Sequence, residues 1–288
     1  MHCSQAASEP VHQNDDGDHL MPAPPPEFDA WLSQLEVRHL ADLRVPEVTR
    51  ALRALSSAYV QRRHKVSGGS TLDTAGKRAA FALFYAPLHF LATHHVIGAL
   101  DANAPSPTVI LDLGCGTGVA GAAWALASER RPPVIGIDRH PWAVQEAKWT
   151  LRQLRVDGQA RQGDLTRLPR VEPRGAIVAA YALNELAGPA RETIEGDLID
   201  AAAAGARVLV LEPIARAITP WWNSSAARVI AAGGRADEWK IRLELPPLLQ
   251  LFDRAAGLHH GEIKLRSLYL PGGRASGGGP EQGRVSSA

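Results

Sequence analysis

The spacing of apolar residues predicts helices in the first part of the chain. Apolar side chains recur at the period of one helix face over residues 27–43 and again over residues 46–59. A third stretch, residues 74–100, is long and mostly apolar, and Pro87 predicts a kink in it. We therefore expect an N-terminal helical cap over residues 27–104.

After this region, short apolar runs alternate with helical patterns. The predicted strands are residues 108–113, 133–138, 159–163, 176–181, 207–211, 239–245 and 262–270. The last of them is expected at a sheet edge. The predicted helices are residues 119–129, 141–156, 189–204 and 220–232. Apolar strands that alternate with helices are typical of a parallel sheet covered on both faces. Residues 105–270 are therefore predicted to form an α/β domain with a doubly wound, seven-stranded sheet.

The two ends of the chain have the composition of disordered segments. Residues 1–26 are polar and end in a proline-rich run, and residues 271–288 are rich in glycine, so both are expected to be flexible tails. The N-terminus lacks the basic and apolar regions of a secretory signal, which favours a cytoplasmic location. No run of about 18 uncharged apolar residues occurs, so no membrane span is expected.

Composition narrows the function classes. Hydrophobic residues make up 45% of the chain and charged residues 21%, which are ordinary values for a globular protein. The formal net charge of +1 excludes a strongly basic nucleic-acid binder, so such binding would need a local patch. The two cysteines, Cys3 and Cys115, can form neither a disulfide framework nor a zinc site. The histidine pairs 94–95 and 259–260 lack a third ligand, so no metal site is expected.

The strongest chemical signal is a glycine-rich turn between a predicted strand and a predicted helix. Gly114, Gly116 and Gly118 alternate with other residues and allow a sharp turn and a close approach of the backbone to a ligand. Asp112 lies at the carboxyl end of the strand, where a carboxylate can hold a ligand's ammonium group. A dinucleotide site requires glycine at the position of Val119, and no Walker lysine follows, so neither NAD nor a cradled phosphate is favoured.

Residues 112–118, Asp-Leu-Gly-Cys-Gly-Thr-Gly, closely resemble the first motif of class I S-adenosylmethionine-dependent methyltransferases. The resemblance extends over residues 108–211. It implies a Rossmann-like fold, S-adenosylmethionine as the cofactor and methyl transfer as the reaction. The cofactor-binding residues that it implies are Asp112, Gly114, Cys115, Gly116, Gly118, Asp138, Arg139, Asp164, Leu165 and Tyr181.

The resemblance also implies individual roles. Asp138 ends the second strand, about twenty residues after the glycine turn, and would accept both ribose hydroxyls. Arg139 or His140 would lie beside the adenine. After the third strand, Asp164 would accept a hydrogen bond from the adenine amino group, and Leu165 would pack on the ring. The glycine turn would lie against the methionine part of the cofactor.

The end of the fourth strand supplies the candidate catalytic residues. In this fold it faces the transferred methyl group, so Tyr181, Asn184 and Glu185 are candidates for contact with substrate or cofactor. Alternatively, Asn184 and Glu185 cap the next helix. Methyl transfer from a sulfonium needs alignment and desolvation more than a catalytic dyad, and the sequence indicates no general base.

The helical cap offers a further hypothesis. A long apolar helix directly before the cofactor domain must bury most of its surface, so residues 74–100 should pack on the sheet domain. The residues of interest on this helix are Lys77, Arg78, Phe81, Phe84 and Tyr85, the last as a pocket wall. The cap would exclude water and select the acceptor, with residues 67–70 as a lid. The alternative is that it gives structural support alone.

A narrower resemblance links residues 180–186 and 208–213 to the methyltransferase-like proteins of the mitochondrial small ribosomal subunit and their bacterial relatives. That family carries a metal-binding cysteine cluster in its C-terminal part, whereas this chain has no cysteine after Cys115. Arginines 152, 155, 161, 167, 170 and 174 form either a patch that faces RNA or solvated helix faces. Two functions stay open: an active methyltransferase on RNA, protein or a small molecule, and a catalytically idle, cofactor-binding assembly factor of the small ribosomal subunit.

Overall fold

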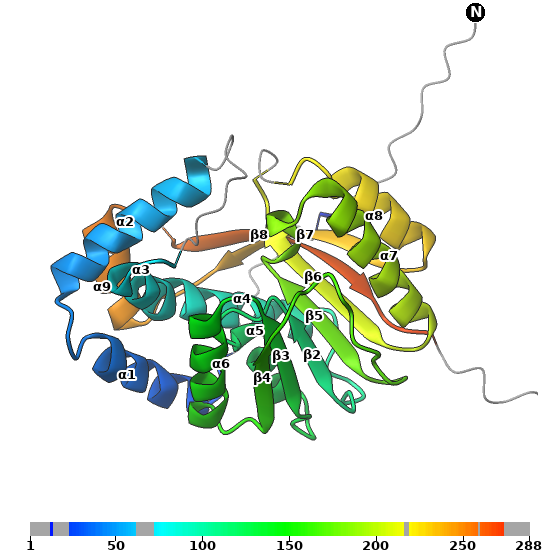
Figure 1. Ribbon diagram of the computed structural model, residues 1–288, viewed down its shortest axis with the longest axis horizontal. Coiled ribbons are helices and arrows are strands. Elements are labelled where there is room, and N and C mark those ends of the chain that lie inside the picture. The colour runs from blue at the N-terminus through cyan, green and yellow to red at the C-terminus, as the bar shows by residue number, and fades with distance from the viewer. Residues whose placement is uncertain (1–11, 14–22, 62–71, 216–218, 259, 274–288) are drawn as a thin grey trace, which may run out of the picture.

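An eight-stranded sheet runs through the middle of the molecule (Figure 1). The computed structural model describes residues 12–13, 23–61, 72–215, 219–258 and 260–273. The strands are β1 (His12–Gln13), β2 (Ile110–Leu113), β3 (Val134–Asp138), β4 (Gly158–Gln162), β5 (Ala176–Ala180), β6 (Arg207–Pro213), β7 (Arg235–Arg242) and β8 (Glu262–Leu270). Their order is β1-β7-β8-β6-β5-β2-β3-β4, and of these strands β8 alone runs antiparallel to its neighbours.

The order of the strands reverses once, beside β2. The chain passes from β2 through β3 to β4 and then returns to β5 on the other side of β2. Such a reversal leaves space at the carboxyl ends of the two strands, where ligands of doubly wound sheets bind. The predicted seven-stranded Rossmann-like sheet is confirmed in β2 to β8, and β1 extends it by a short eighth strand along β7.

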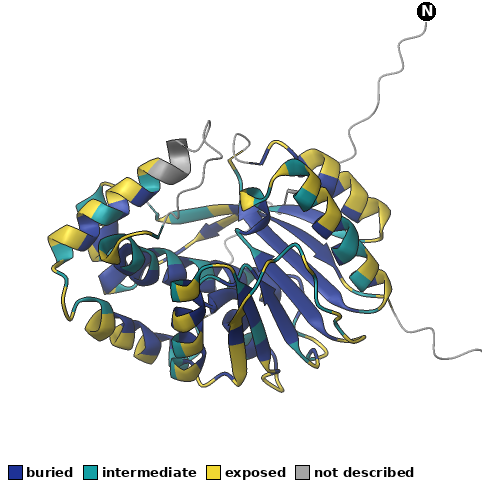
Figure 2. Cartoon of the chain, viewed as in Figure 1, coloured by how far each residue is buried: buried dark blue, intermediate teal, exposed yellow. Residues whose placement is uncertain are grey.

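Helices cover both faces of the sheet, so its central strands are buried, whereas the edge strand β4 is mostly exposed (Figure 2). The helical elements are α1 (Glu27–His39), α2 (Val45–Gln61), α3 (Ala75–Ala80), the π-helical turn η1 (Phe81–Tyr85), α4 (Ala86–Ala99), α5 (Val119–Ala127), α6 (Pro141–Gln153), the 3-10 turn η2 (Leu183–Glu185), α7 (Gly188–Ala203), α8 (Trp222–Ala231) and α9 (Pro247–Ala256). Alternate residues of β6 face opposite layers. Val208 and Val210 pack with α7 and α8, whereas Leu209 and Leu211 pack with the layer that contains α4 and α5.

Several details differ from the sequence prediction. The strand predicted at an edge, β8, lies between β6 and β7, because the chain returns antiparallel after α9. Its apolar sequence could not reveal this position, since it does not specify which strands are its neighbours. The helix α9 was not predicted from the sequence. Within the predicted tail over residues 1–26, His12–Gln13 pair with β7, and the tail otherwise stays a prediction; residues 1–11, 14–22 and 274–288 lie outside the described residues.

The long apolar helix predicted before the sheet runs from α3 through η1 to α4. The kink expected at Pro87 takes the form of the π-helical turn η1, and Pro87 lies in the first turn of α4. Proline has no N–H to donate, and π-helical turns often occur where the regular hydrogen-bond ladder is interrupted. Ala75–Ala99 is long and apolar enough, by length and composition alone, to cross a membrane, yet 72% of its apolar window is buried inside the protein. Such burial is typical of a core helix.

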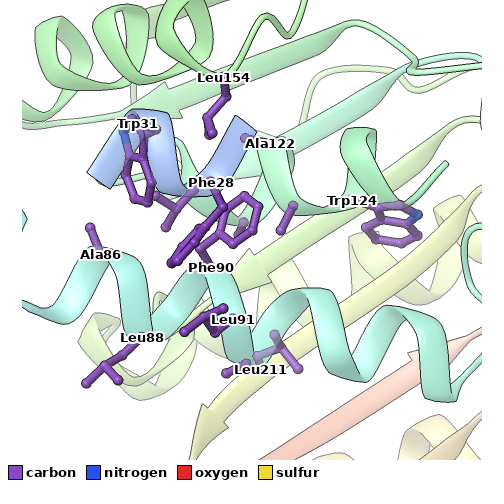
Figure 3. Packing of buried hydrophobic residues seen from close by; sticks show 14 of the residues in the cluster. Phe28, Trp31, Ala86, Leu88, Phe90, Leu91, Ala122, Trp124, Leu154 and Leu211 are labelled. Atoms are coloured by element: carbon purple, nitrogen blue, oxygen red, sulfur yellow. The ribbon is translucent and has the colours of Figure 1, made fainter. Parts of the chain in front are cut away.

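The N-terminal helices and the sheet share one hydrophobic core. Phe28 and Trp31 of α1 lie against Phe90 of α4, with ring centroids 5.1 and 5.9 Å away, and all three side chains are fully buried (Figure 3). The same cluster continues through Ala122 of α5 to Leu211 of β6. The prediction that the cap helix packs on the sheet domain is therefore confirmed. Where the cap ends and the domain begins stays a prediction, because the core crosses that boundary.

A buried carboxylate also ties α1 to the sheet domain. Glu146 of α6 is only 1% exposed, and its oxygens lie 2.8 Å from His39 Nε2 and 3.2 Å from Arg38 Nη2. Burial by itself would raise the pKa of Glu146, but the hydrogen bonds and charges of His39 and Arg38 outweigh burial and lower it. This ion pair gives α1 a defined orientation on α6.

We expect the shared core to make the chain unfold as one unit. Trp31→Ala removes a fully buried side chain and should lower the free energy of unfolding by about 3–5 kcal/mol. The matched control is Val37→Ala on the same helix, where a side chain 68% exposed should matter by less than about 0.5 kcal/mol. Denaturant unfolding, followed by circular dichroism and tryptophan fluorescence, measures both. Two separate transitions, with the Trp31 effect confined to one, would contradict the shared core.

Candidate functional site

The glycine turn joins β2 to α5 at the carboxyl edge of the sheet. Gly114, Gly116 and Gly118 all have positive φ, of 63°, 51° and 80°, and Gly118 is the cap residue of α5. A Cβ atom at Gly114 would lie 2.7 Å from the Cβ of Ala182, and one at Gly118 would lie 3.0 Å from that of Ala147. The backbone conformation and the crowding both require glycine, as the sequence predicts.

Asp112 anchors the start of α5 from beneath this turn. Its side chain is 1% exposed, and Oδ2 accepts a hydrogen bond of 2.8 Å from the Gly121 N–H. Burial raises the pKa of Asp112 to about 7, although the bond from Gly121 opposes this rise. The structure thus gives Asp112 a partner within the fold, and the expected contact with a cofactor ammonium group stays a prediction.

Cys115 contributes its backbone to the turn. Its side chain is buried with Val144, Ala147 and Ala160, and a Cβ atom at Gly136 would lie 2.9 Å from its sulfur. Burial raises the pKa of the thiol well above its usual range. The side chain of Cys115 is therefore part of the packing between β3 and α6.

Asp138 connects the end of β3 to the glycine turn. Oδ2 accepts a bond of 2.9 Å from the Gly116 N–H, and Oδ1 accepts one of 2.7 Å from the His140 N–H. Each carboxylate oxygen has more than one lone pair, so both can accept further bonds from ligand hydroxyls. The structure therefore brings Asp138 and Gly116 together, as the predicted ribose and methionine subsites of one ligand require.

The remaining predicted adenine-site residues lie on exposed loops. Oδ1 of Asp164 accepts a bond from the Thr166 N–H, which lowers the pKa of Asp164. Leu165 comes within 3.4 Å of the position that a Cβ atom at Gly114 would take. Arg139 forms an ion pair of 3.2 Å with Glu185, so two predicted residues from different strand ends contact each other. Their roles toward adenine stay predictions.

Tyr181 follows β5 in an unusual backbone conformation. Its φ is +57°, which is rare for a bulky residue, and its N–H donates a bond of 2.7 Å to the Leu211 carbonyl. Its ring stacks on His89 of α4, with centroids 4.0 Å apart and planes 18° apart. Burial raises the pKa of Tyr181. The strained turn thus aims the ring at the cap helix.

A buried carboxylate at the end of β6 holds the segment after Tyr181. Glu212 is 0% exposed, and it accepts bonds from the Leu183 N–H, the Asn184 N–H and the Asn184 side-chain amide, at 2.9, 3.2 and 2.6 Å. The alternative that Asn184 and Glu185 cap the next helix is wrong, because α7 begins at Gly188 with Ala187 as its cap residue. We noted Glu212 in the sequence only as part of a resemblance, since nothing local shows which backbone it reaches.

His89 is the site residue that our sequence analysis missed. It belongs to a series with Phe81 and Tyr85, four residues apart, and Phe81 lies 3.9 Å from the position of a Cβ atom at Gly116. Ring spacings of 6.1 Å connect Phe81, Tyr85 and His89 to one another. The recurrence of rings at every fourth position is a sequence signal that could have revealed His89.

Part of this chain matches a known protein family. Residues 110–203 match the family model described as methyltransferase domain. No curated protein matches the chain. Similar solved structures include magnesium protoporphyrin IX methyltransferase from Synechocystis with bound S-adenosylmethionine, at 14% identity and a TM-score of 0.42, over 80% of this chain and 98% of that one. The N-methyltransferase NodS from Bradyrhizobium japonicum, with S-adenosyl-L-homocysteine, is similar at 15% identity and a TM-score of 0.44, over 63% and 88% of the two chains.

These findings give no support to the narrower ribosomal resemblance. Among the described residues there is also no group of three His, Cys, Asp or Glu side chains that could hold a metal ion. The glycine turn and the acids at the ends of β2 and β3 fit S-adenosylmethionine. So does the space at the turn glycines that a Cβ atom would fill. Residues 110–203 form a class I S-adenosylmethionine-dependent methyltransferase domain, and the protein is an S-adenosylmethionine-dependent methyltransferase whose acceptor is undetermined.

Proposed function

We propose that the acceptor is methylated beneath the α3–η1–α4 helix, at the carboxyl ends of β2 and β5. One observation carries this proposal: a single helix reaches both the glycine turn, through Phe81, and the end of β5, through the stack of His89 on Tyr181. A helix in that position excludes water from the space between the two strand ends. It thereby limits which molecules can approach.

The protein's own residues would act mainly by alignment. S-adenosylmethionine supplies an already activated methyl group on a sulfonium sulfur. The glycine turn offers backbone close to the ligand, and Asp138 offers oxygens for the ribose hydroxyls. Glu212 fixes the turn that carries Tyr181, which makes it a positioning residue. Asn184 is already bonded to Glu212, and Glu185 to Arg139, so neither side chain is held toward the proposed acceptor space by these bonds.

A contact with RNA or a ribosomal subunit, without catalysis, is the second candidate. The arginines that motivated it are all exposed: Arg152, Arg155, Arg161, Arg167, Arg170 and Arg174. Exposure supports an RNA-facing patch and equally supports solvated helix faces. Glu212, one of the residues on which the ribosomal resemblance was based, accepts a bond from the Asn184 side chain inside the fold, which gives it a structural role in this chain. Residues 67–70, the predicted lid, lie outside the described residues.

Transfer itself is the first test. Purified protein and S-adenosylmethionine with a labelled methyl group should label one of three separated fractions, RNA, protein or small metabolites, from a cell extract. Asp138→Ala is the matched inactive control. Binding of S-adenosylhomocysteine without labelling of any fraction would favour the idle assembly factor over the enzyme.

Loss of Asp138 should weaken cofactor binding. The substitution Asp138→Ala removes charge-assisted acceptors for the ribose and the bond to the Gly116 N–H. Calorimetry with S-adenosylhomocysteine should show a loss of affinity of about ten- to a hundredfold, with no binding of NAD to either protein. Asp157→Ala, at an exposed position before β4, is the control and should bind normally. Normal binding by Asp138→Ala would show that the ribose site is elsewhere.

Titration of Glu212 should make stability depend on pH. Burial raises the pKa of Glu212 to about 8 from its ordinary 4.5, so the unfolded chain loses this proton first as pH rises. Its contribution is therefore fully present below about pH 4.5 and is lost progressively up to about pH 8. Glu212→Gln should reduce the fall in melting temperature between pH 5.5 and 8.5. Asp112 titrates in the same range, so Asp112→Asn is measured in parallel. If the melting temperature of Glu212→Gln falls with pH as steeply as that of the wild type, the assignment to Glu212 is refuted.

A further inference from the structure

One face of the cap helix carries only aromatic rings. From Ala79 to Thr93, every residue is buried except three, and these are Phe81, Tyr85 and His89. They follow one another at four-residue intervals, and with Tyr181 they form a series that we call the aromatic stripe. Because the surrounding helix is fully packed, this partial exposure is confined to one line along it.

The aromatic stripe spans the space where we propose that transfer takes place. Its first ring, Phe81, lies beside the glycine turn, 3.9 Å from the position of a Cβ atom at Gly116. Its last two rings, His89 and Tyr181, stack at 4.0 Å at the end of β5. A molecule that binds between these points would contact the rings of the aromatic stripe one after another.

The aromatic stripe is also uncharged. Burial lowers the pKa of His89 to about 3, so its imidazole is neutral. The guanidinium of Arg78, one turn before Phe81, lies over the ring of Trp142 at 5.9 Å. Four neutral rings offer stacking and edge-to-face contacts, but no charge to hold a phosphate or carboxylate.

We propose that the methyl acceptor is a planar aromatic or heteroaromatic ring that bears a nucleophilic oxygen or nitrogen and stacks on the aromatic stripe. This inference rests on the proposed function and names its substrate class. In the transfer, a lone pair of the acceptor atom forms a bond to the methyl carbon. The carbon–sulfur bond breaks with its electron pair left on sulfur, and the acceptor's proton is released to water. A free small molecule and an unpaired nucleobase share this chemistry.

Matched flat and saturated probes test the proposal. Binding of 2-naphthol and of decahydro-2-naphthol to the full chain is measured by ligand-observed NMR, with and without S-adenosylhomocysteine. We expect 2-naphthol to bind at least about tenfold more tightly, since ring contacts beyond area burial contribute on the order of 0.5–1.5 kcal/mol each. Equal affinity for the two probes would overturn the proposal.

Two leucine variants on the same helix provide the control. Phe81→Leu removes a ring of the aromatic stripe and should lose most of the preference for 2-naphthol. Phe84→Leu removes a fully buried ring that faces the core, and it should keep the preference even if stability falls. Circular dichroism verifies folding of both. A preference lost equally in both variants, or kept in Phe81→Leu, contradicts a role of the aromatic stripe in recognition.

A third probe distinguishes a nucleobase from a free ring compound as the acceptor. Cofactor binding is measured separately. A single-stranded RNA with one unpaired base should compete with 2-naphthol if the acceptor is a nucleobase, whereas an abasic strand should not. If RNA does not compete while 2-naphthol binds, the acceptor is a free ring compound. Failure of S-adenosylhomocysteine to bind would refute the proposed function. Normal binding of it together with absent ring preference would refute only the aromatic acceptor.

Discussion

Backbone N–H groups at the carboxyl edge of the sheet need hydrogen-bond acceptors that do not fill the space where a ligand binds. Three carboxylates provide these acceptors. Asp112 accepts from the Gly121 N–H, Asp138 from the Gly116 and His140 N–H groups, and Glu212 from the turn after β5. Each acid ends or nearly ends a strand. Asp112 reaches the helix after its own strand, whereas Asp138 and Glu212 reach the turns that follow the neighbouring strands β2 and β5. The strand-end acids of the sheet therefore help to position the loops of the site.

Burying these acids costs free energy. Burial raises the pKa of Asp112 to about 7 and that of Glu212 to about 8, so neither ionises as readily as an exposed carboxyl. Replacing either by an apolar residue would leave buried N–H groups without a partner, which is worse. The strained φ of Tyr181 is held by the same network, since Glu212 binds the residues that follow it.

The N-terminal helices belong to the site as much as to the core. The inner face of α4 fills the layer against the sheet, while the partly exposed rings of η1 and α4 line the proposed acceptor space. Phe28, Trp31 and the Glu146 ion pair fix α1 in place, and α1 packs against α4. The helix α4 therefore cannot move without disturbing the main hydrophobic cluster. Substrate selection by the cap would thus use a rigid wall, and any adjustment would come from the acceptor or from side chains.

The sequence by itself determined the features that depend on neighbouring residues. The apolar period predicted most helices and strands, and the alternation of Gly114, Gly116 and Gly118 behind Asp112 identified the cofactor turn, because glycine adopts those dihedral angles without strain. The acid of β3 was also predictable, since its distance along the chain from the glycine turn is set by one helix and one strand.

Only the tertiary structure decided the contacts between distant segments. The place of β8 inside the sheet, the bonds from the Asn184 turn to Glu212, and the stack of His89 on Tyr181 join residues far apart in sequence. Local pattern specifies which face of an element is buried, but not which partner covers it. That choice follows from the packing of all layers at once, and so the contacts on the acceptor side of the site could not be predicted before the fold was known.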